Sequence, residues 1–360
     1  MARNTQPFDL APTAQGGGSG GFDWRPPPPG SMQLPEMITF QRWHGLSITR
    51  PVMSQPRRIV PGATYLLTRR SLRRHLLFRP DAAITRIIIY ALAVSAERHG
   101  IRVHALCAMS THVHLVVTDV RGVLPRFLQS FHRLIALGTK ALRAWEGAVW
   151  DHEPTSVVHL LTREAVVEKI AYTLANPVLA GIVRHAQEWP GAKVRVGELG
   201  RAELRAKRPE VYFKSNNPQW PDEATVLLAL PPEVESDRAD RFRSDVAAEL
   251  ERQEARAHAE VRRRGLRFMG AERACKVSPY DRASSPEPLR GRNPTFAVGR
   301  GRTDAGMRAI AAVRAFRAAY RGAIDRWRSG VRDAVFPVGT WLMRVLHGAS
   351  VDDIDIASAA

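Results

Sequence analysis

The chain has 360 residues, with 53 Lys or Arg against 35 Asp or Glu, and its net charge is +18 at neutral pH. This excess favours a polyanionic partner, most often nucleic acid, although an arginine-rich composition without specific meaning gives the same number. Two cysteines far apart, Cys107 and Cys275, argue against a disulfide framework or a thiolate zinc site. No apolar run is long enough to span a membrane, and no signal peptide stands at the start. We therefore expect a cytoplasmic protein with no membrane partner.

Residues 1–56 are predicted to be a disordered leader. They contain a glycine-rich tract at residues 16–21 and four consecutive prolines at residues 26–29. Segments of this composition bury too little apolar surface to offset the entropy lost on ordering.

Residues 57–190 are expected to form the first folded domain, which opens with a strand at residues 63–68. Four basic residues follow that strand directly: Arg69, Arg70, Arg73 and Arg74. A basic loop at the end of a strand is a candidate contact for DNA phosphates, and a solvated charge run is the alternative.

Hydrophobic periodicity predicts the other elements of this domain. Helices are expected at residues 81–99, 122–142 and 162–177, and strands at residues 101–106, 115–118, 148–150 and 156–160. Pro177 places the end of the third helix near Asn176. The order of these elements favours an α+β fold, with a ferredoxin-like antiparallel sheet and helices packed on one face, which leaves the other face free for a site.

The second half of the chain is expected to carry most of the charge. Residues 191–235 are rich in proline and read as a connecting segment with a short strand at 225–230. Residues 236–360 are predicted to be a basic, mainly helical region, with helices at 236–267 and 306–329. Between residues 251 and 332, twenty Lys or Arg stand against eight Asp or Glu. This region suits an accessory nucleic-acid contact, and a pair of solvated basic helices is equally compatible.

Two histidines separated by one residue lie where a strand is expected. Because side chains of a strand alternate between its faces, His112 and His114 point to one face and Val113 to the other. Two imidazoles on one face make half of a metal site, or they are simply packed histidines. The helix at 162–177 adds Tyr172 and Asn176, which are four residues apart and therefore lie on one helix face.

Taken together, these motifs resemble the single-tyrosine HUH transposases, specifically the REP-associated tyrosine transposases and their insertion-sequence relatives. The His-hydrophobic-His motif is His112-Val113-His114, and the second motif is Tyr172 followed by Asn176-Pro177 and then Ala180-Gly181. The likeness spans residues 57–190.

The resemblance implies a transposase that cuts and rejoins single-stranded or hairpin DNA. It implies Tyr172 as a nucleophile that forms a 5′-phosphotyrosine intermediate. It also implies Mg²⁺ or Mn²⁺ held by His112, His114 and Asn176. Relatives occur as homodimers and as monomers. The base that activates Tyr172 is not identified, and Glu168 and Lys169 are candidates. Two alternatives stay open: a domesticated DNA-binding protein that no longer cleaves, and an RNA-binding protein.

Overall fold

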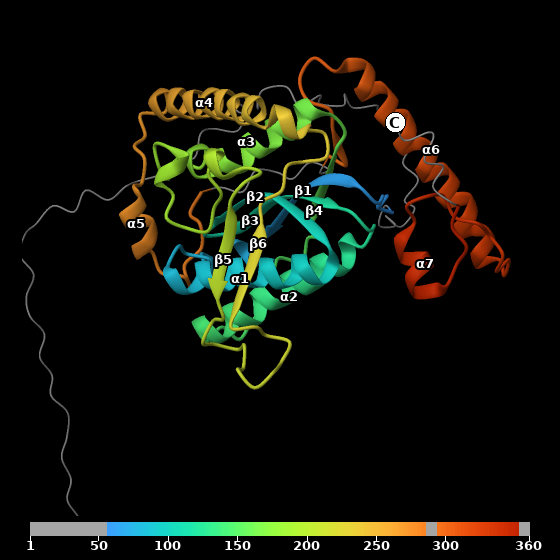
Figure 1. Ribbon diagram of the computed structural model, residues 1–360, viewed down its shortest axis with the longest axis horizontal. Coiled ribbons are helices and arrows are strands. Elements are labelled where there is room, and N and C mark those ends of the chain that lie inside the picture. The colour runs from blue at the N-terminus through green and yellow to red at the C-terminus, as the bar shows by residue number, and fades with distance from the viewer. Residues whose placement is uncertain (1–55, 286–293, 353–360) are drawn as a thin grey trace, which may run out of the picture. The chain divides into compact units, whose positions relative to one another are not determined.

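The structure, a computed structural model, describes residues 56–285 and 294–352 (Figure 1). All of the predicted leader except its last residue lies outside these ranges. The strands are β1 (Ala63–Arg70), β2 (Ile101–Met109), β3 (His112–Asp119), β4 (Ser156–Leu160), β5 (Glu203–Lys207), β6 (Glu223–Leu227) and β7 (Phe296–Ala297). The α-helices are α1 (Ala82–His99), α2 (Leu124–Arg143), α3 (Arg163–Leu179), α4 (Ala239–Arg263), α5 (Ala271–Lys276), α6 (Thr303–Arg328) and α7 (Trp341–His347). None of the helices in the described ranges is long and apolar enough to cross a membrane.

The main sheet has the strand order β2-β3-β1-β4-β7. Its first four strands are antiparallel and follow the chain order β1-α1-β2-β3-α2-β4, which is the ferredoxin-like arrangement. The predicted α+β class and antiparallel core are therefore confirmed. The fifth strand, β7, pairs parallel to β4 and makes the sheet mixed. Its two residues are too few to leave a periodic signal in the sequence, and they cover what would otherwise be a free sheet edge.

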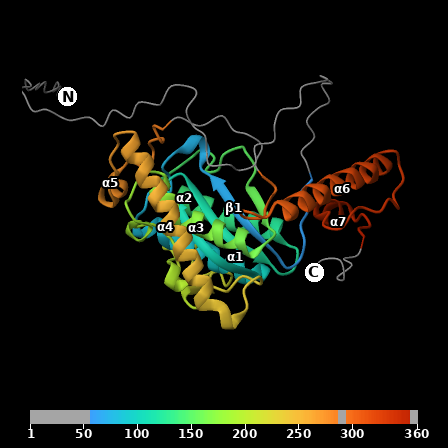
Figure 2. The same ribbon diagram turned by 90° about the horizontal axis from the view of Figure 1, so that it is seen from above.

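Helices cover both faces of this sheet. Figure 1 shows α1 and α2 on one face, and α3 on the other with α4 packed on its outer side. Figure 2, seen from above, shows α4 crossing over α3. The prediction that helices pack on one face only is therefore wrong. The physical reason lies in strands such as β3, whose residues from Val113 onward are all buried, so neither face is left to water.

Capping chemistry sets the ends of α1. The carboxylate of Asp81 accepts a hydrogen bond from the backbone N–H of Ile84 at 2.9 Å, which satisfies a donor that the first turn cannot pair internally. Gly100 ends the helix with φ of 66°, a left-handed conformation that glycine adopts without steric cost. The expected helix at residues 81–99 therefore matches α1 to within one residue.

The helix α3 begins as expected and ends later. Thr162 caps it, because its hydroxyl accepts from the N–H of Ala165 at 3.2 Å. Pro177 lies inside the helix, which continues to Leu179, rather than ending near Asn176. A proline is tolerated here because only the last turn follows it, and the N–H groups of Ala180 and Ile182 still bond to the carbonyls of Asn176 and Pro177.

Residues 191–246 pack on the same hydrophobic core as the first domain. Leu204 of β5, Phe213 of the β5–β6 loop and Phe242 of α4 are all buried in one cluster with α1 and the sheet. The strand expected at 225–230 is β6, and it pairs with β5, which the sequence did not reveal. The strand expected at 148–150 is reduced to a single bridge between Trp150 and Ser71.

The C-terminal helices have a small core of their own. The buried members of this cluster come from α6, α7 and the segments around them: Ala323, Ile324, Phe336, Met343 and Ala349. The helix expected at 306–329 is α6, and the one expected at 236–267 is α4. The described part of the predicted basic region is thus mainly helical.

Candidate active site

The two histidines of the predicted motif lie on β3, a central strand bonded on both sides. His112 pairs with Arg70 of β1 and Met109 of β2, and His114 pairs with Thr68 and Cys107. Strand pairing on both sides holds the backbone, and alternation places both imidazoles on the face that α3 covers. Their ring centroids are 4.6 Å apart with the planes at 81°.

One ring nitrogen of each histidine lies within hydrogen-bond distance of a threonine hydroxyl. The Nδ1 atom of His114 lies 3.0 Å from Thr68 Oγ1, and Nδ1 of His112 lies 2.9 Å from Thr111 Oγ1. These contacts fix the orientation of both rings and turn their Nε2 atoms toward the site. The Nε2 atom of His114 is fully buried and has no hydrogen-bond partner among the described residues. Leaving such an atom unpaired costs about 1–3 kcal/mol unless a ligand satisfies it.

The tyrosine and the asparagine reach the same place from α3. Asn176 is buried, and its Nδ2 donates to the backbone carbonyl of Tyr172 at 2.8 Å, one helical turn earlier. The Tyr172 ring lies 5.6 Å from the His114 ring, nearly perpendicular to it. The Asn176 side chain also contacts both imidazoles and the Tyr172 phenol closely enough to shift their pKa values. The structure therefore brings His112, His114, Tyr172 and Asn176 into one cluster between sheet and helix.

Burial decides the charge of the two histidines. The pKa of His112 is lowered to about 4, mainly by burial and then by the nearby Arg70 guanidinium, while contact with Asn176 acts in the opposite direction. Burial also holds the pKa of His114 well below its ordinary range, with His112 and Arg70 adding to the effect. Both imidazoles are therefore neutral at pH 7, which is the form that can donate a lone pair to a metal ion.

The nucleophile candidate is protonated in the resting protein. Burial raises the pKa of the Tyr172 phenol above its usual value, while Arg70 and Asn176 pull it down. The Lys169 ammonium lies 6.0 Å from the centroid of the Tyr172 ring and 3.0 Å from Glu168 Oε1. Arg70 is thus the cation placed to stabilise negative charge on the phenol oxygen.

A metal ion would find two imidazole nitrogens and one amide oxygen here. In the part of the chain that the structure describes, no three His, Cys, Asp or Glu side chains form a metal cluster. The predicted ligand set differs from such clusters because its third member, Asn176, is an amide. In the tautomer whose Nδ1–H is donated to Thr68 Oγ1, the buried Nε2 of His114 has a lone pair that no described residue satisfies, and this lone pair fits a cation.

The four basic residues of the predicted DNA contact point to different sides of the sheet. Arg70 faces the histidines and Tyr172, and Arg74 is close enough to lower the pKa of His112. Arg69 lies on the opposite face, toward α2, and donates to the backbone carbonyl of Asp151 at 3.0 Å. Arg73 is exposed, with φ of 47°. Their contact with DNA stays a prediction.

Two residues of this cluster were not assigned to it from the sequence. Thr68 lies against His114, and Arg70 was expected only in a basic loop. Alternation along β1 places Thr68 and Arg70 on one face, but only the register with β3 shows that this is the histidine face.

Comparison with known proteins gives distant structural matches. No protein-family model and no curated protein matches the chain. A REP-associated tyrosine transposase bound to a REP hairpin is 16% identical, with a TM-score of 0.35, covering 41% of this chain and 85% of that chain. A protein assigned as a transposase from Deinococcus radiodurans is 18% identical, with a TM-score of 0.23, covering 31% of this chain and 85% of that chain. The chain is structurally similar to both at distant sequence identity.

Proposed function

We propose that this protein is a transposase that cuts and rejoins single-stranded or hairpin DNA through Tyr172. The observation that carries the proposal is the cluster itself: a tyrosine, an asparagine and a histidine with an unpaired buried nitrogen meet from two rigid elements. The net charge of +18 supports a nucleic-acid substrate. We place the catalytic unit in residues 57–190, the connecting segment in residues 191–235 and an accessory region in residues 236–360.

In the proposed reaction, the Tyr172 oxygen attacks the phosphorus of the scissile phosphodiester. A bond forms between that oxygen and phosphorus, and the bond from phosphorus to the 3′ oxygen breaks. The phenol proton passes to water, and the departing 3′ oxygen takes up a proton from water to become a free 3′-hydroxyl. The reverse attack by a 3′-hydroxyl releases Tyr172 and joins the strands, so the phosphodiester energy is kept without ATP.

Each neighbour of Tyr172 has a proposed part in this step. His112, His114 and Asn176 would hold Mg²⁺ or Mn²⁺, which when bound supplies polarisation of the scissile phosphate. Arg70 lowers the pKa of the phenol and is placed to pair with a phosphate oxygen. Thr68 holds the His114 ring in place through Nδ1.

A covalent adduct on a denaturing gel tests the proposal. Labelled single-stranded hairpin DNA is incubated with the full chain and Mn²⁺, and the mixture is then denatured. We expect a protein–DNA band with the wild type and none with Tyr172→Phe. The matched control is Tyr320→Phe, a tyrosine of α6 outside this cluster, which should leave the band unchanged.

Two outcomes would overturn the proposal. An adduct that persists in Tyr172→Phe would exclude Tyr172 as the nucleophile. Salt-sensitive binding of the same DNA with no adduct at all would favour the alternative, a domesticated DNA-binding protein without cleavage activity.

A further inference from the structure

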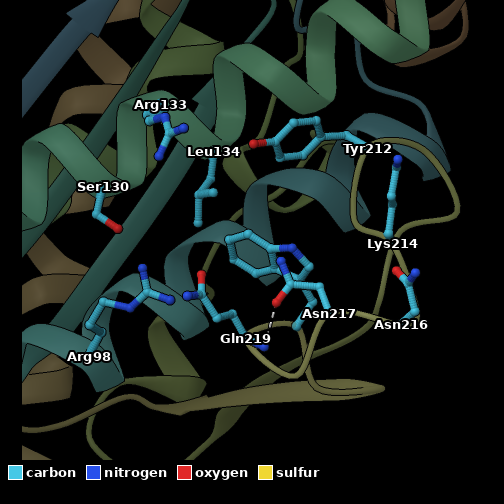
Figure 3. A pocket seen from close by; sticks show the side chains of 10 residues that line it. Arg98, Ser130, Arg133, Leu134, Tyr212, Lys214, Asn216, Asn217 and Gln219 are labelled. Atoms are coloured by element: carbon cyan, nitrogen blue, oxygen red, sulfur yellow. Dashed lines mark hydrogen bonds between the residues drawn. The ribbon is translucent and has the colours of Figure 1, made fainter.

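A second pocket lies away from the candidate active site. It has a volume of about 410 Å³ and lies between the helix pair α1–α2 and the loop that joins β5 to β6. Ser130 and Leu134 of α2 form one wall, as Figure 3 shows. Because α1 and α2 cover the sheet face opposite to His112 and His114, the sheet separates this pocket from Tyr172.

The charge of the pocket is entirely positive. Its charged lining residues are Arg98 of α1, Arg133 of α2 and Lys214 of the loop, and no carboxylate among the described residues lines it. Arg133 and Lys214 are exposed, and their side chains make no ion pair or hydrogen bond with another described residue. Cations gathered without a counter-charge attract an anion, and an opening of this size admits one larger than a simple ion.

Aromatic rings and primary amides complete the lining. Trp220 and Tyr212 supply the rings, and the Arg98 guanidinium lies 5.9 Å from the centroid of the Trp220 ring. The amides are those of Asn216, Asn217 and Gln219. Figure 3 shows the Tyr212 hydroxyl directed toward Leu134 and the Gln219 amide facing the Arg98 side, while the Asn217 amide oxygen accepts from the backbone N–H of Gln219 at 3.0 Å.

The loop that carries these groups is fixed before any ligand arrives. Phe213 is buried and anchors the loop, with its ring 5.0 Å from Tyr90 of α1 and 5.3 Å from Trp220. The Tyr90 hydroxyl donates to the carbonyl of Pro221 at 2.7 Å, and an Arg208 guanidinium nitrogen donates to the carbonyl of Trp220 at 2.8 Å. The pocket is therefore largely preformed, which reduces the entropy lost when it is filled.

One strained residue shapes the pocket. Tyr212 has φ of 67°, in the left-handed region that side chains with a Cβ rarely adopt. Such a conformation persists where the surrounding structure enforces it, and here the neighbouring Phe213 is locked into the core. The Tyr212 ring therefore lines the pocket while it packs against the edge of the core, 5.2 Å from the ring of Phe213.

We infer that this pocket binds one unpaired nucleotide of a DNA strand, at a site separate from Tyr172. The rings can stack on a base, which has a π-face whatever its identity. The amides can hydrogen-bond its edge, and the three cations can pair with the phosphates on either side of it. The choice of DNA over other polyanions rests on the proposed function. The base must be unpaired, because a base inside a duplex cannot enter a pocket of this kind.

Photocrosslinking locates such a nucleotide directly. A single-stranded oligothymidylate with one 5-iodouracil is irradiated with full-length Tyr172→Phe protein, which cannot form the proposed adduct, and the linked peptide is mapped by mass spectrometry. We expect linkage at Tyr212 or Trp220. Linkage only at residues outside the β5–β6 loop, or none at all, would overturn the inference.

Substitutions in the pocket distinguish the contribution of base stacking to oligonucleotide affinity from that of positive charge. Trp220→Leu should weaken oligonucleotide affinity about tenfold, the usual effect of removing one aromatic ring on which a base stacks. Because Trp220 also packs on Phe213, the exposed pair Arg133→Gln and Lys214→Gln provides a second test. That double variant should reduce the slope of log affinity against log salt by about 1–2, because each of the two cations would pair with at most one phosphate. An unchanged slope would contradict the inference.

The matched control is Arg195→Gln. Arg195 is an exposed arginine of the connecting segment, outside the accessory region, and it does not line the pocket. The substitution removes a positive charge outside the pocket and should leave both the crosslink and the slope unchanged. A decrease in crosslinking equal to that in the double variant would show a general charge effect and would overturn the inference.

A competition assay distinguishes binding of a DNA strand in this pocket from binding of a free nucleotide. Thymidine monophosphate at millimolar concentration should displace the crosslink only weakly, because it has no second phosphate to pair with the pocket. Displacement as efficient as that by unlabelled oligonucleotide would make this a mononucleotide site and would overturn the strand assignment.

The pocket inference and the proposed function can fail independently of each other. A wild type that forms the Tyr172 adduct but no crosslink overturns the pocket alone, and a wild type that crosslinks at Tyr212 or Trp220 but forms no adduct overturns the proposed function alone.

Discussion

At the scale of single residues, the unpaired Nε2 of His114 is the most informative atom in the cluster. A buried imidazole nitrogen without a partner destabilises the protein, and a bound cation would relieve that cost. Mn²⁺ at one hundred times its dissociation constant should stabilise the wild type by about 2.7 kcal/mol and raise its Tm by a few degrees. We expect His114→Ala to abolish this rise and His347→Ala, at an exposed histidine of α7, to preserve it. Thermal unfolding with and without Mn²⁺ measures the effect, and an equal rise in His114→Ala would contradict the ligand assignment.

Thr68 should act on cleavage by positioning His114. Thr68→Val keeps the shape of the side chain but removes its hydrogen bond to Nδ1. Removing such a partner of a metal-bound histidine typically lowers metal affinity or activity about 10–100-fold. We expect that decrease in the rate of adduct formation, and recovery with Thr68→Ser, which retains the hydroxyl. A threonine that matters only for packing would give the opposite order, with Val tolerated and Ser impaired.

Strand and helix periodicity place His112 with His114, and Tyr172 with Asn176, on one face each. The resemblance to the HUH motifs is what singled out these four residues as a site. The sequence could not show that the two pairs face each other, since that depends on how α3 packs on the sheet. Thr68 and Arg70 could not be assigned to the site from the sequence either. The sheet face on which their side chains lie is set by the register of β1 with β3.

At the scale of elements, the close approach of α1 and α2 supports the wall of the second pocket. A Cβ added at Gly138 of α2 would lie 2.8 Å from Cγ2 of Ile87 in α1. Gly138→Ala should therefore destabilise the protein by about 1–3 kcal/mol through overpacking, despite the better helix propensity of alanine. Gly322→Ala in α6, where nothing lies within 4 Å of the added atom, should stabilise by about 0.5–1 kcal/mol. Urea unfolding of both variants measures the difference, and equal changes would contradict this packing.

Elements with strong periodicity could be predicted, and short elements could not. The segments that became α1, α2 and α6 have apolar stripes many residues long, and α4 was predicted as a long charged helix. The strand β7 has two residues, and it exists because the chain passes the free edge of β4. The same limit applies to β5, whose pairing with β6 builds the loop that carries Tyr212 and Trp220.

At the scale of the whole molecule, buried neutral histidines make the fold sensitive to acid. His104 is 1% exposed and bonds to the carbonyl of Ala229 and to Thr118 Oγ1, and burial lowers its pKa to about 4. Burial likewise lowers the pKa of His132 to about 3 and of His159 to about 4. Unfolded histidines take up protons below about pH 6.5, whereas these three do not while folded, so stability falls as the pH drops from 6.5 toward 4.

This acid sensitivity can be measured by urea unfolding at pH 7 and pH 5. His104 alone should account for a loss of about 1–2 kcal/mol between these two values. We expect His104→Gln to be less stable at pH 7, because its hydrogen bonds are disturbed, but to lose less on acidification. A variant whose loss between pH 7 and pH 5 equals that of the wild type would contradict the account.

Mapping the modified residue shows whether Tyr172 forms a covalent bond to DNA. The wild-type protein is incubated with single-stranded hairpin DNA and Mn²⁺, digested with nuclease and protease, and analysed by mass spectrometry. We expect a nucleotide attached through a 5′-phosphate to Tyr172. A nucleotide attached to any other residue would contradict this expectation.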